Sequence, residues 1–325
     1  MTARRFPLPR LRPTSGPTIA ALLYAVMYAV YGARAPSAFS LTGITDLLDN
    51  TIVLAVAAAG LTLVILAGEF DLSGIGVIAI TNAVVATIST GRLGSAGALV
   101  AVMVIGAAAG LLNGWLVTTL GLQSLAVTIG TMIASEGVAL LILSAPGGEV
   151  ADAIDNGMTG DLGHTIPVAA ILIVALLVLW FLFAQTRAGI AIYAVGADEN
   201  TARLSGIDVR RAKLLAFVLA GLTYGLAGYM LSAETGSGDP RASDSFLLFM
   251  YASVAIGGTS LAGGRGGVFG SVVGAGLLTV MQKMLFALGA AEFYTSVFSG
   301  LVMLMALAVS SLSAALSRPR RRRPT

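Results

Sequence analysis

Long apolar stretches, separated by short polar ones, follow one another along the whole chain. About 20 helical residues cross the hydrocarbon core of a bilayer, so the pattern predicts membrane-spanning helices. Such spans have to be helical, because lipid offers no hydrogen-bond partner to backbone N–H and C=O groups. We expect ten spans, at residues 17–35, 48–67, 73–90, 97–119, 124–143, 166–184, 212–232, 246–260, 267–288 and 293–316.

Composition supports this prediction. Of the 325 residues, 57% are hydrophobic and 11% are charged, whereas a soluble domain carries roughly 25% charged residues. We therefore expect an all-α integral membrane protein whose residues 17–316 form a single transmembrane domain with some short, broken helices. The absence of cysteine excludes disulfides and thiolate chemistry, and His164, the only histidine, lies in a polar segment. We expect this chain to bind no metal or cofactor of its own.

The distribution of charge predicts the orientation. Lys and Arg mark the cytoplasmic side of membrane spans, and basic residues fill the tails at 1–16 and 317–325. Ten crossings return the C-terminus to the side of the N-terminus, so both tails are expected in the cytoplasm. The basic loop at 185–213 then falls inside, and the acidic loops at 144–165 and 233–245 fall outside. Basic tails beside membrane spans indicate contact with anionic lipid rather than with nucleic acid.

Glycine occurs at two kinds of position. Rows at four-residue spacing lie within the spans and let helix backbones approach closely in lipid; they are Gly106, Gly110 and Gly114, then Gly221 and Gly225, then Gly270 and Gly274. Two glycine-rich stretches, 68–74 and 257–266, resemble each other and are predicted on the cytoplasmic side. Stretches of this kind are typical of helices that break near a translocation path.

The segment 186–213 is too long for a simple connection. Asp198 is suited to an N-cap, Glu199 to a first turn and Gly206 to a C-terminal stop, which predicts a short amphipathic helix between them. A rigid helix at the membrane surface can transmit a push from a soluble partner. The residues alone are equally compatible with a surface helix that has no partner.

Four segments of the chain resemble the membrane subunits of ribose-type ABC importers, the binding-protein-dependent permeases that also serve xylose, galactose and autoinducer-2. They are GEFDLSGIG at 68–76, GLLNGWLVTTLGLQSLAVTIGTM at 110–132, YAVGADENTARLSGIDVRRAK at 193–213 and IGGTSLAGGRGGVFG at 256–270. Together with the spacing of the spans, the likeness covers nearly the whole chain from about residue 45. The third and fourth segments are the most specific to the family.

The resemblance implies a permease of the bacterial inner membrane that works with several partners. A second permease subunit, identical or paralogous, would complete the pathway, two cytoplasmic ATPases would hydrolyse ATP with Mg²⁺, and an external binding protein would deliver the solute. The segment 186–213 would dock into the ATPase through the positions that match the family, which are Gly196, Glu199, Ala202, Leu204 and Gly206.

This chain itself is not expected to be an enzyme. A P-loop needs glycine directly before its lysine, whereas the only two lysines, Lys213 and Lys283, follow Ala212 and Gln282. Without cysteine, and with one histidine in a loop, no nucleophile–base or metal constellation is present either. ATP hydrolysis therefore belongs to another polypeptide.

Five polar residues are candidates for the gate and the translocation pathway. Asp71 and Ser73 match the family where the third span begins, as helix caps or as part of a cytoplasmic gate. Asn113, inside the fourth span, could bond a hydroxylated solute or a neighbouring helix. Glu136 and Lys283 depart from the family, which often has a basic residue and an asparagine there, and we expect them to line the solute cavity, as a pair or separately.

The solute itself remains open between several classes. Asn82 has the same two possible roles as Asn113, and hydroxyl groups suit both amides. Family members commonly carry acidic residues in the span before Ile256, whereas this chain has Phe246-Leu247-Leu248-Phe249. A small hydroxylated solute, either a sugar or a sugar-like molecule such as a polyol or nucleoside, is expected. The alternative is an ion-coupled secondary transporter, for which Glu136 is the one deep carboxylate.

Overall fold

The computed structural model describes residues 15–163, 165–241 and 246–289, together with Tyr294, Val297, Gly300 and Leu301. The predicted tenth span at 293–316 and both basic tails lie almost entirely outside the described residues, as does His164.

The described chain is almost entirely helical. Its only strands are β1 (Asp161–Leu162) and β2 (Ile166–Pro167), which pair antiparallel. The helices in chain order are α1 (Ser15–Arg34), the 3-10 helix η1 (Pro36–Phe39), α2 (Leu41–Leu66), α3 (Gly74–Ile88), α4 (Gly94–Thr119), α5 (Ser124–Ile142), α6 (Asp152–Met158), α7 (Val168–Ala184), α8 (Arg187–Ala197), α9 (Glu199–Leu204), α10 (Val209–Thr235), α11 (Phe246–Ile256) and α12 (Val268–Ala287).

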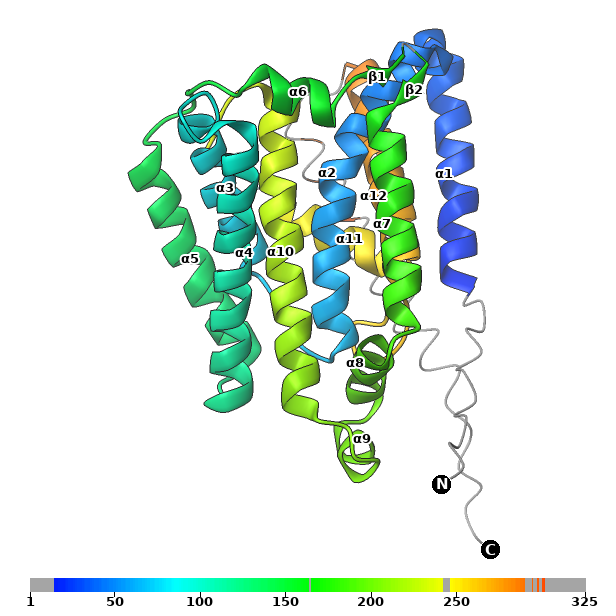
Figure 1. Ribbon diagram of the computed structural model, residues 1–325. Coiled ribbons are helices and arrows are strands. Elements are labelled where there is room, and N and C mark those ends of the chain that lie inside the picture. The colour runs from blue at the N-terminus through cyan, green and yellow to red at the C-terminus, as the bar shows by residue number, and fades with distance from the viewer. Residues whose placement is uncertain are drawn as a thin grey trace, which may run out of the picture.

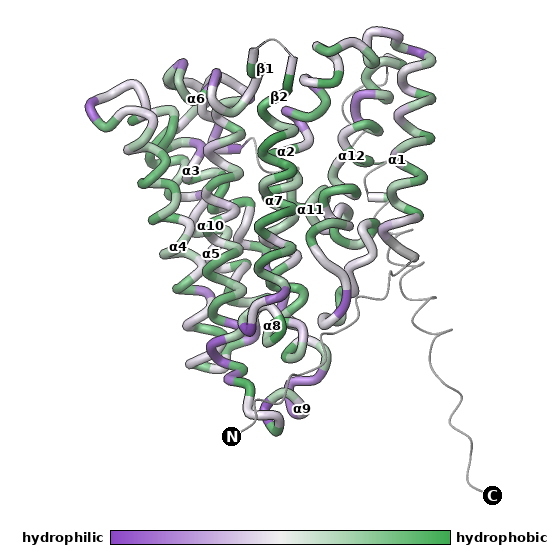
Figure 2. Tube along the Cα trace, turned by 45° about the vertical axis from the view of Figure 1, so that its right-hand side comes forward, coloured by the Kyte–Doolittle hydropathy of each residue, from purple (hydrophilic) through white to green (hydrophobic). Residues whose placement is uncertain are grey.

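The long helices run side by side as one bundle (Figure 1). One end carries α8 and α9 and is called the α9 end below; the opposite end carries α6 and the two strands and is called the α6 end. α5 and α1 lie at opposite edges of the bundle, and α1 packs against α12. Hydrophobic residues follow the helices between the two ends, and many of the hydrophilic ones gather near the ends (Figure 2).

Among the described residues, five helices are long and apolar enough to cross a membrane, namely α2, α4, α5, α10 and α12. A sixth crossing results if α7 and α8 are counted as one span bent by 77°. α3 and α11 are shorter apolar helices, as expected for broken spans. The helical character of a multi-pass membrane protein is confirmed, whereas ten crossings and cytoplasmic termini stay predictions. α2 begins at Leu41 and is longer than the predicted span.

α2 is the central helix. Every residue from Thr51 to Leu66 is buried, and α10, α12, α11 and α7 pack around it. Its sequence combines small residues with branched apolar ones, as in Val53-Leu54-Ala55-Val56-Ala57-Ala58-Ala59, so neighbouring helices can approach on every side. A helix that is apolar all round has no solvent-facing side, which explains its place inside the bundle.

The glycine rows form the closest helix contacts, as the sequence predicts. α4 and α10 cross where Gly106 faces the carbonyl of Gly221 and Gly110 faces that of Phe217. Likewise, Gly270 and Gly274 lie against the backbone of Gly257 and Ser253. At each of these glycines a Cβ atom would overlap the opposing backbone, so the spacing between these helices depends on the missing side chain.

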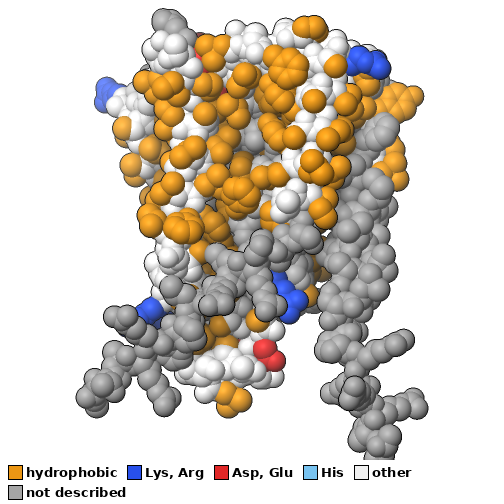
Figure 3. Space-filling model, turned by 90° about the vertical axis from the view of Figure 1, so that its right-hand side faces the viewer, with side chains coloured by type: hydrophobic (Ala, Val, Ile, Leu, Met, Phe, Trp, Pro, Cys, Tyr) orange, Lys and Arg blue, Asp and Glu red, His pale blue; other side chains and the backbone are white. Residues whose placement is uncertain are grey.

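The outer wall of the bundle is apolar. In one face of the molecule, hydrophobic side chains spread over the middle while charged ones lie toward the upper and lower ends (Figure 3). The exposed side chains of α5 and α7 include Ile133, Leu141, Val174 and Leu179. Such an extent of exposed apolar surface requires a covering of lipid or of other subunits.

Replacement of two glycines by alanine should have opposite effects on stability. In an ordinary helix interior, alanine is better than glycine by about 1 kcal/mol. Gly137 on α5 has open space around its Cβ position, so Gly137→Ala should slightly raise the melting temperature in detergent. Gly221→Ala should lower it, because the new methyl meets the backbone of Gly106, and overpacking costs about 1–3 kcal/mol. Equal shifts for both variants, measured by thermal unfolding, would contradict the packing described here.

Candidate functional site

The segment after α7 folds into two short helices at the α9 end. The hydroxyl of Thr186 caps α8 by accepting from Gly189 N at 3.1 Å. The carboxylate of Asp198 caps α9 by accepting from Thr201 N at 2.7 Å, and Gly206, with φ +81°, follows the end of α9. The predicted short helix, its N-cap and its stop are therefore confirmed. α8 was not predicted as a separate helix.

The five predicted coupling residues divide into exposed and internal positions. Leu204, at the end of α9, is 90% exposed, and Gly206 is exposed beside it. Ala202 points the other way and is buried in a small core with Ile192 and Val195 of α8. Only part of this set is therefore available to a partner, and the rest holds α9 in place.

Gly196 lies in a contact between three segments, which we call the glycine junction and define by Gly68, Gly196, Gly263 and Gly264. A Cβ on Gly196 would overlap the carbonyl of Leu66 at the end of α2. A Cβ on Gly263 would meet the backbone of both Gly68 and Gly196. Gly264 N also donates to Leu66 O at 3.1 Å. The two glycine-rich stretches that resemble each other thus meet in space, and α8 is packed between them.

Charged side chains connect α9 to the bundle beside this junction. Lys213, in the first turns of α10, pairs with Glu69 at 2.7 Å and with Glu199 at 2.8 Å. Glu199 also pairs with Arg203 at 2.9 Å. The hydrogen bond from Lys213 lowers the pKa of Glu199 below its usual value, and the N–H of Thr201 lowers that of Asp198. Both carboxylates are therefore ionised at neutral pH.

A buried chain of hydrogen bonds begins two residues after Glu69. The Oδ1 atom of Asp71 accepts from Ser73 N at 2.9 Å and from Ser73 Oγ at 2.6 Å. Asn113 Nδ2 donates to Ser73 Oγ at 2.9 Å, and Thr131 Oγ1 donates to Asn113 Oδ1 at 2.6 Å. Tyr251 of α11 donates to the backbone carbonyl of Asp71 at 3.2 Å. We call Asp71, Ser73, Asn113 and Thr131 the buried polar chain; it connects the start of α3 to α4 and α5.

The last member of this chain faces an open groove of about 680 Å³ between α3, α4 and α5. Most of its lining is apolar, and Gln123, Thr131 and Ser135 supply the polar side chains. Asp71, Ser73 and Asn113 are not among the lining residues. The buried polar chain therefore connects the start of α3 to the groove through Thr131, and α3 also lines the groove directly with Ile80.

Comparison with known proteins shows the family of the chain. Residues 43–307 match the family model described as "Branched-chain amino acid transport system / permease component". The ribose import permease protein of Escherichia coli strain K12 is 32% identical over 291 residues, covering 88% of this chain and 91% of that protein. The chain belongs to the family of ribose-type ABC importer permeases. It is a membrane transport subunit and not an enzyme.

Further relatives have other sugars in their names. The D-allose transport system permease protein of Escherichia coli strain K12 is 32% identical, covering 89% of this chain and 90% of that protein. The L-arabinose ABC transporter permease protein of Azospirillum brasilense is 30% identical, covering 88% and 85%. No solved structure matches the chain.

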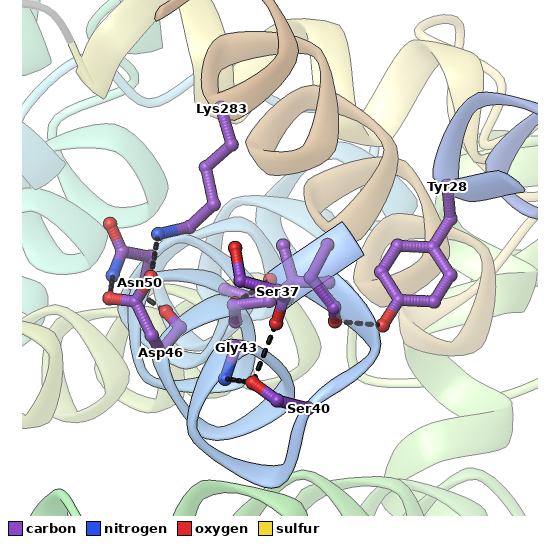
Figure 4. A network of polar contacts seen from close by, with 10 residues as sticks. Tyr28, Ser37, Ser40, Gly43, Asp46, Asn50 and Lys283 are labelled. Carbon is purple, nitrogen blue, oxygen red and sulfur yellow. Dashed lines mark hydrogen bonds and ion pairs between the residues drawn. The ribbon is translucent and has the colours of Figure 1, made fainter. Parts of the chain in front are cut away.

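Two of the five gate and pathway candidates, Glu136 and Lys283, belong to helices at opposite edges of this permease. Lys283 of α12 pairs with Asp46 at the start of α2, at 2.6 Å (Figure 4). Glu136 belongs to α5, on the far side of the bundle from α12 (Figures 1 and 2). The structure therefore shows no Glu136–Lys283 pair: Lys283 joins the α6 ends of two helices. Asp71, Ser73 and Asn113 are brought together as described.

The amides of the two candidate asparagines are both engaged within the protein. Asn113 is part of the buried polar chain. Asn82 donates to Ser232 Oγ at 2.8 Å and accepts from Asp239 N at 2.6 Å, so it joins α3 to α10 and to the loop after it. Helix–helix bonding, one of the two roles open to these residues, is the one the structure shows.

Three residues of the site were not predicted from the sequence: Glu69 and Lys213, which form an ion pair, and Thr131, which ends the buried polar chain. Glu69 and Lys213 stand in two of the four family-like segments, and their opposite charges in an apolar chain were the available signal. Nothing in the sequence placed the two segments side by side. The role of Thr131 could not be recognised from the sequence, because hydroxyl groups inside membrane helices commonly bond a backbone carbonyl of their own helix. Thr131 also lies 3.1 Å from such a carbonyl, that of Val127.

Removal of the Asn113 amide should destabilise the bundle. Asn113→Leu removes two hydrogen bonds between helices, the one to Ser73 Oγ and the one from Thr131, and each such bond contributes about 0.5–1.5 kcal/mol. We expect a clear fall in the melting temperature in detergent. Asn156→Leu is the matched control, because Asn156 is exposed on α6 and bonds only within its own helix, to Asp152 O. Indistinguishable melting of the two variants would show that the buried polar chain does not contribute to stability.

Proposed function

We propose that this permease passes a sugar or a sugar-like solute across the bacterial inner membrane, powered by a separate ATPase that docks at the α9 end. The observation that carries the proposal is the α8–α9 segment. It presents an exposed apolar side chain at its tip, yet its base is fixed by the glycine junction and by Lys213. The sugar-like solute is supported by relatives that are named as permeases for ribose, D-allose and L-arabinose.

We assign the α9 end to the cytoplasm. It carries Arg187, Arg203, Arg210, Arg211 and Lys213, and the first described residue of α1 lies at the same end, directly after the basic stretch at 1–14. The α6 end is dominated by acidic residues, although it also contains Arg34, Arg92, Arg241 and Lys283. This asymmetry agrees with the preference of Lys and Arg for the cytoplasmic side.

Leu204 is the natural anchor for the ATPase. A leucine this exposed at the tip of a polar helix leaves apolar surface in water, and burying such a side chain contributes about 1.5–3 kcal/mol. The surrounding charged groups of Glu199 and Arg203 form a polar rim, which resembles the anatomy of specific protein interfaces. The nucleotide and its Mg²⁺ would be held entirely by the ATPase.

The remaining partners are assigned by chemistry and position. A second permease, either another copy or a paralogue, would cover the apolar groove beside α5 and complete the pathway. Thr131, Ser135 and Gln123 would then offer hydrogen bonds to solute hydroxyl groups.

A binding protein would deliver the solute at the α6 end, where Asp152 and Asp155 are exposed on α6. Ion-coupled transport is not favoured, because the relatives include permeases for ribose, D-allose and L-arabinose, the last of them named as an ABC transporter permease.

The docking proposal predicts the effect of a charge at the α9 tip. Leu204→Asp should weaken binding of the ATPase at least tenfold, since each 1.4 kcal/mol corresponds to a factor of ten. Sugar uptake by cells should fall in parallel. The measurement is co-purification of the ATPase from membranes, together with uptake of radiolabelled ribose, allose and arabinose as the first solutes.

Leu93→Asp is the matched control, because Leu93 is also an exposed leucine, 64% accessible, but precedes α4 at the α6 end. It should retain the ATPase. If Leu204→Asp binds the ATPase as well as the unaltered chain does, α9 is not the docking element. If the unaltered chain takes up its solute in cells depleted of ATP, the permease is not ATP-driven.

A further inference from the structure

Lys213 is the meeting point of two segments that are far apart in sequence. Its ammonium group lies 2.7 Å from the carboxylate of Glu69, in the loop between α2 and α3, and 2.8 Å from that of Glu199, in α9. No other lysine or arginine among the described residues forms ion pairs with two carboxylates. We call these three residues the Lys213 link.

The two halves of the link differ in exposure. The side chains of Lys213 and Glu69 are each 15% exposed, whereas that of Glu199 is 41% exposed. Glu199 has a second cationic neighbour, Arg203, within the same helix. Removal of Lys213 therefore leaves Glu69 as a largely buried carboxylate without this partner, which is strongly unfavourable, while Glu199 keeps both water and Arg203.

Each half also leads to a different part of the permease. On one side, Glu199 belongs to the helix whose tip carries the exposed Leu204. On the other side, Glu69 is followed directly by Phe70, whose N–H donates to Ser124 Oγ at the start of α5 at 3.3 Å. Asp71, the first member of the buried polar chain, comes next. The link thus stands between the docking helix and the polar residues that reach the groove.

The neighbouring glycine junction cannot replace the link. The junction joins α8, α2 and the 257–266 loop through backbone contact, which fixes one spacing. The Lys213 link joins α9 to the α2–α3 loop through flexible side chains, which can lengthen, shorten or exchange partners as α9 moves. An ion pair of low exposure also keeps its strength at physiological salt better than a surface pair.

We propose that Lys213 is the positioning residue that passes the movement of α9 to the α2–α3 loop, and from there to the buried polar chain. This inference rests on the proposed docking of an ATPase on α9. When α9 is displaced, the shared ammonium draws Glu69 with it or releases it, and the start of α3 follows. Lys213 contacts neither solute nor nucleotide in this scheme; it sets how much transport each hydrolysed ATP produces.

The test distinguishes a loss of coupling between ATP hydrolysis and transport from a loss of ATPase binding. The permease is purified with its ATPase and reconstituted with its binding protein in proteoliposomes, and solute uptake and ATP hydrolysis are measured together. Lys213→Met should retain the ATPase and at least half of its hydrolysis, but lower the ratio of solute transported to ATP hydrolysed at least tenfold. Lys213→Arg, which keeps the charge and can reach both carboxylates, should restore at least a third of the ratio.

Variants of the two carboxylates and of a neighbouring arginine test whether the effect depends on the Lys213 link itself. Glu69→Gln and Glu199→Gln should both lower the ratio, because each removes one of the two ion pairs through which Lys213 joins α9 to the α2–α3 loop. Arg211→Met is the matched control: it removes a positive charge two residues away, from a side chain that is 87% exposed and pairs only with Asp208 in its own turn. Its ratio of transport to hydrolysis should stay within twofold of the unaltered chain.

Three results would overturn the inference. The first is an unchanged ratio in Lys213→Met. The second is loss of the ATPase from this variant, which would make Lys213 a docking determinant. The third is an unchanged ratio in Glu69→Gln, which also decides the question if Lys213→Met does not fold. None of these refutes the proposed function, which fails only if the unaltered permease transports its solute without ATP hydrolysis or without a bound ATPase.

Discussion

The structure depends on peptide backbones that come into direct contact where glycine leaves out the side chain. In lipid, apolar side chains gain little by leaving one apolar surface for another, so close packing and hydrogen bonding hold helices together. The α4–α10 crossing at Gly106 and Gly221 uses this contact in the middle of the bundle. The glycine junction around Gly196 uses it at the α9 end, where helices end and loops begin.

This constraint explains how broken helices are tolerated. α3 and α11 are too short to cross the bilayer by themselves, and the loops beside them expose backbone groups that lipid cannot satisfy. The loops are therefore packed against protein. Gly264 N bonds the carbonyl of Leu66, and the buried polar chain from Asp71 occupies the start of α3. The α8–α9 segment touches these loops as well as α2, α7 and α10, so a movement of this segment reaches the places where the helices are interrupted.

Much of this fold could be predicted from local sequence. Apolar stretches located the helices, glycine spacing predicted close crossings, and Asp198 and Gly206 bounded α9, because each of these features depends on residues near one another in the chain. The pairing of Lys213 with Glu69 could not be predicted in the same way. Charge alone does not say which loops meet. A pair of Lys283 with Glu136 was one of two arrangements that the sequence left open, and in the structure Lys283 pairs with Asp46.

The central claim is that α9 and α6 lie on opposite sides of the membrane, with α9 in the cytoplasm beside its ATPase. Because the chain contains no cysteine, single cysteines can be introduced at exposed positions, Asn200→Cys in α9 and Asn156→Cys in α6, and labelled with a membrane-impermeant maleimide on spheroplasts. The account predicts that Asn156→Cys is labelled on intact spheroplasts, and Asn200→Cys only after detergent opens the membrane and releases the ATPase. Labelling of Asn200→Cys on intact spheroplasts would contradict it.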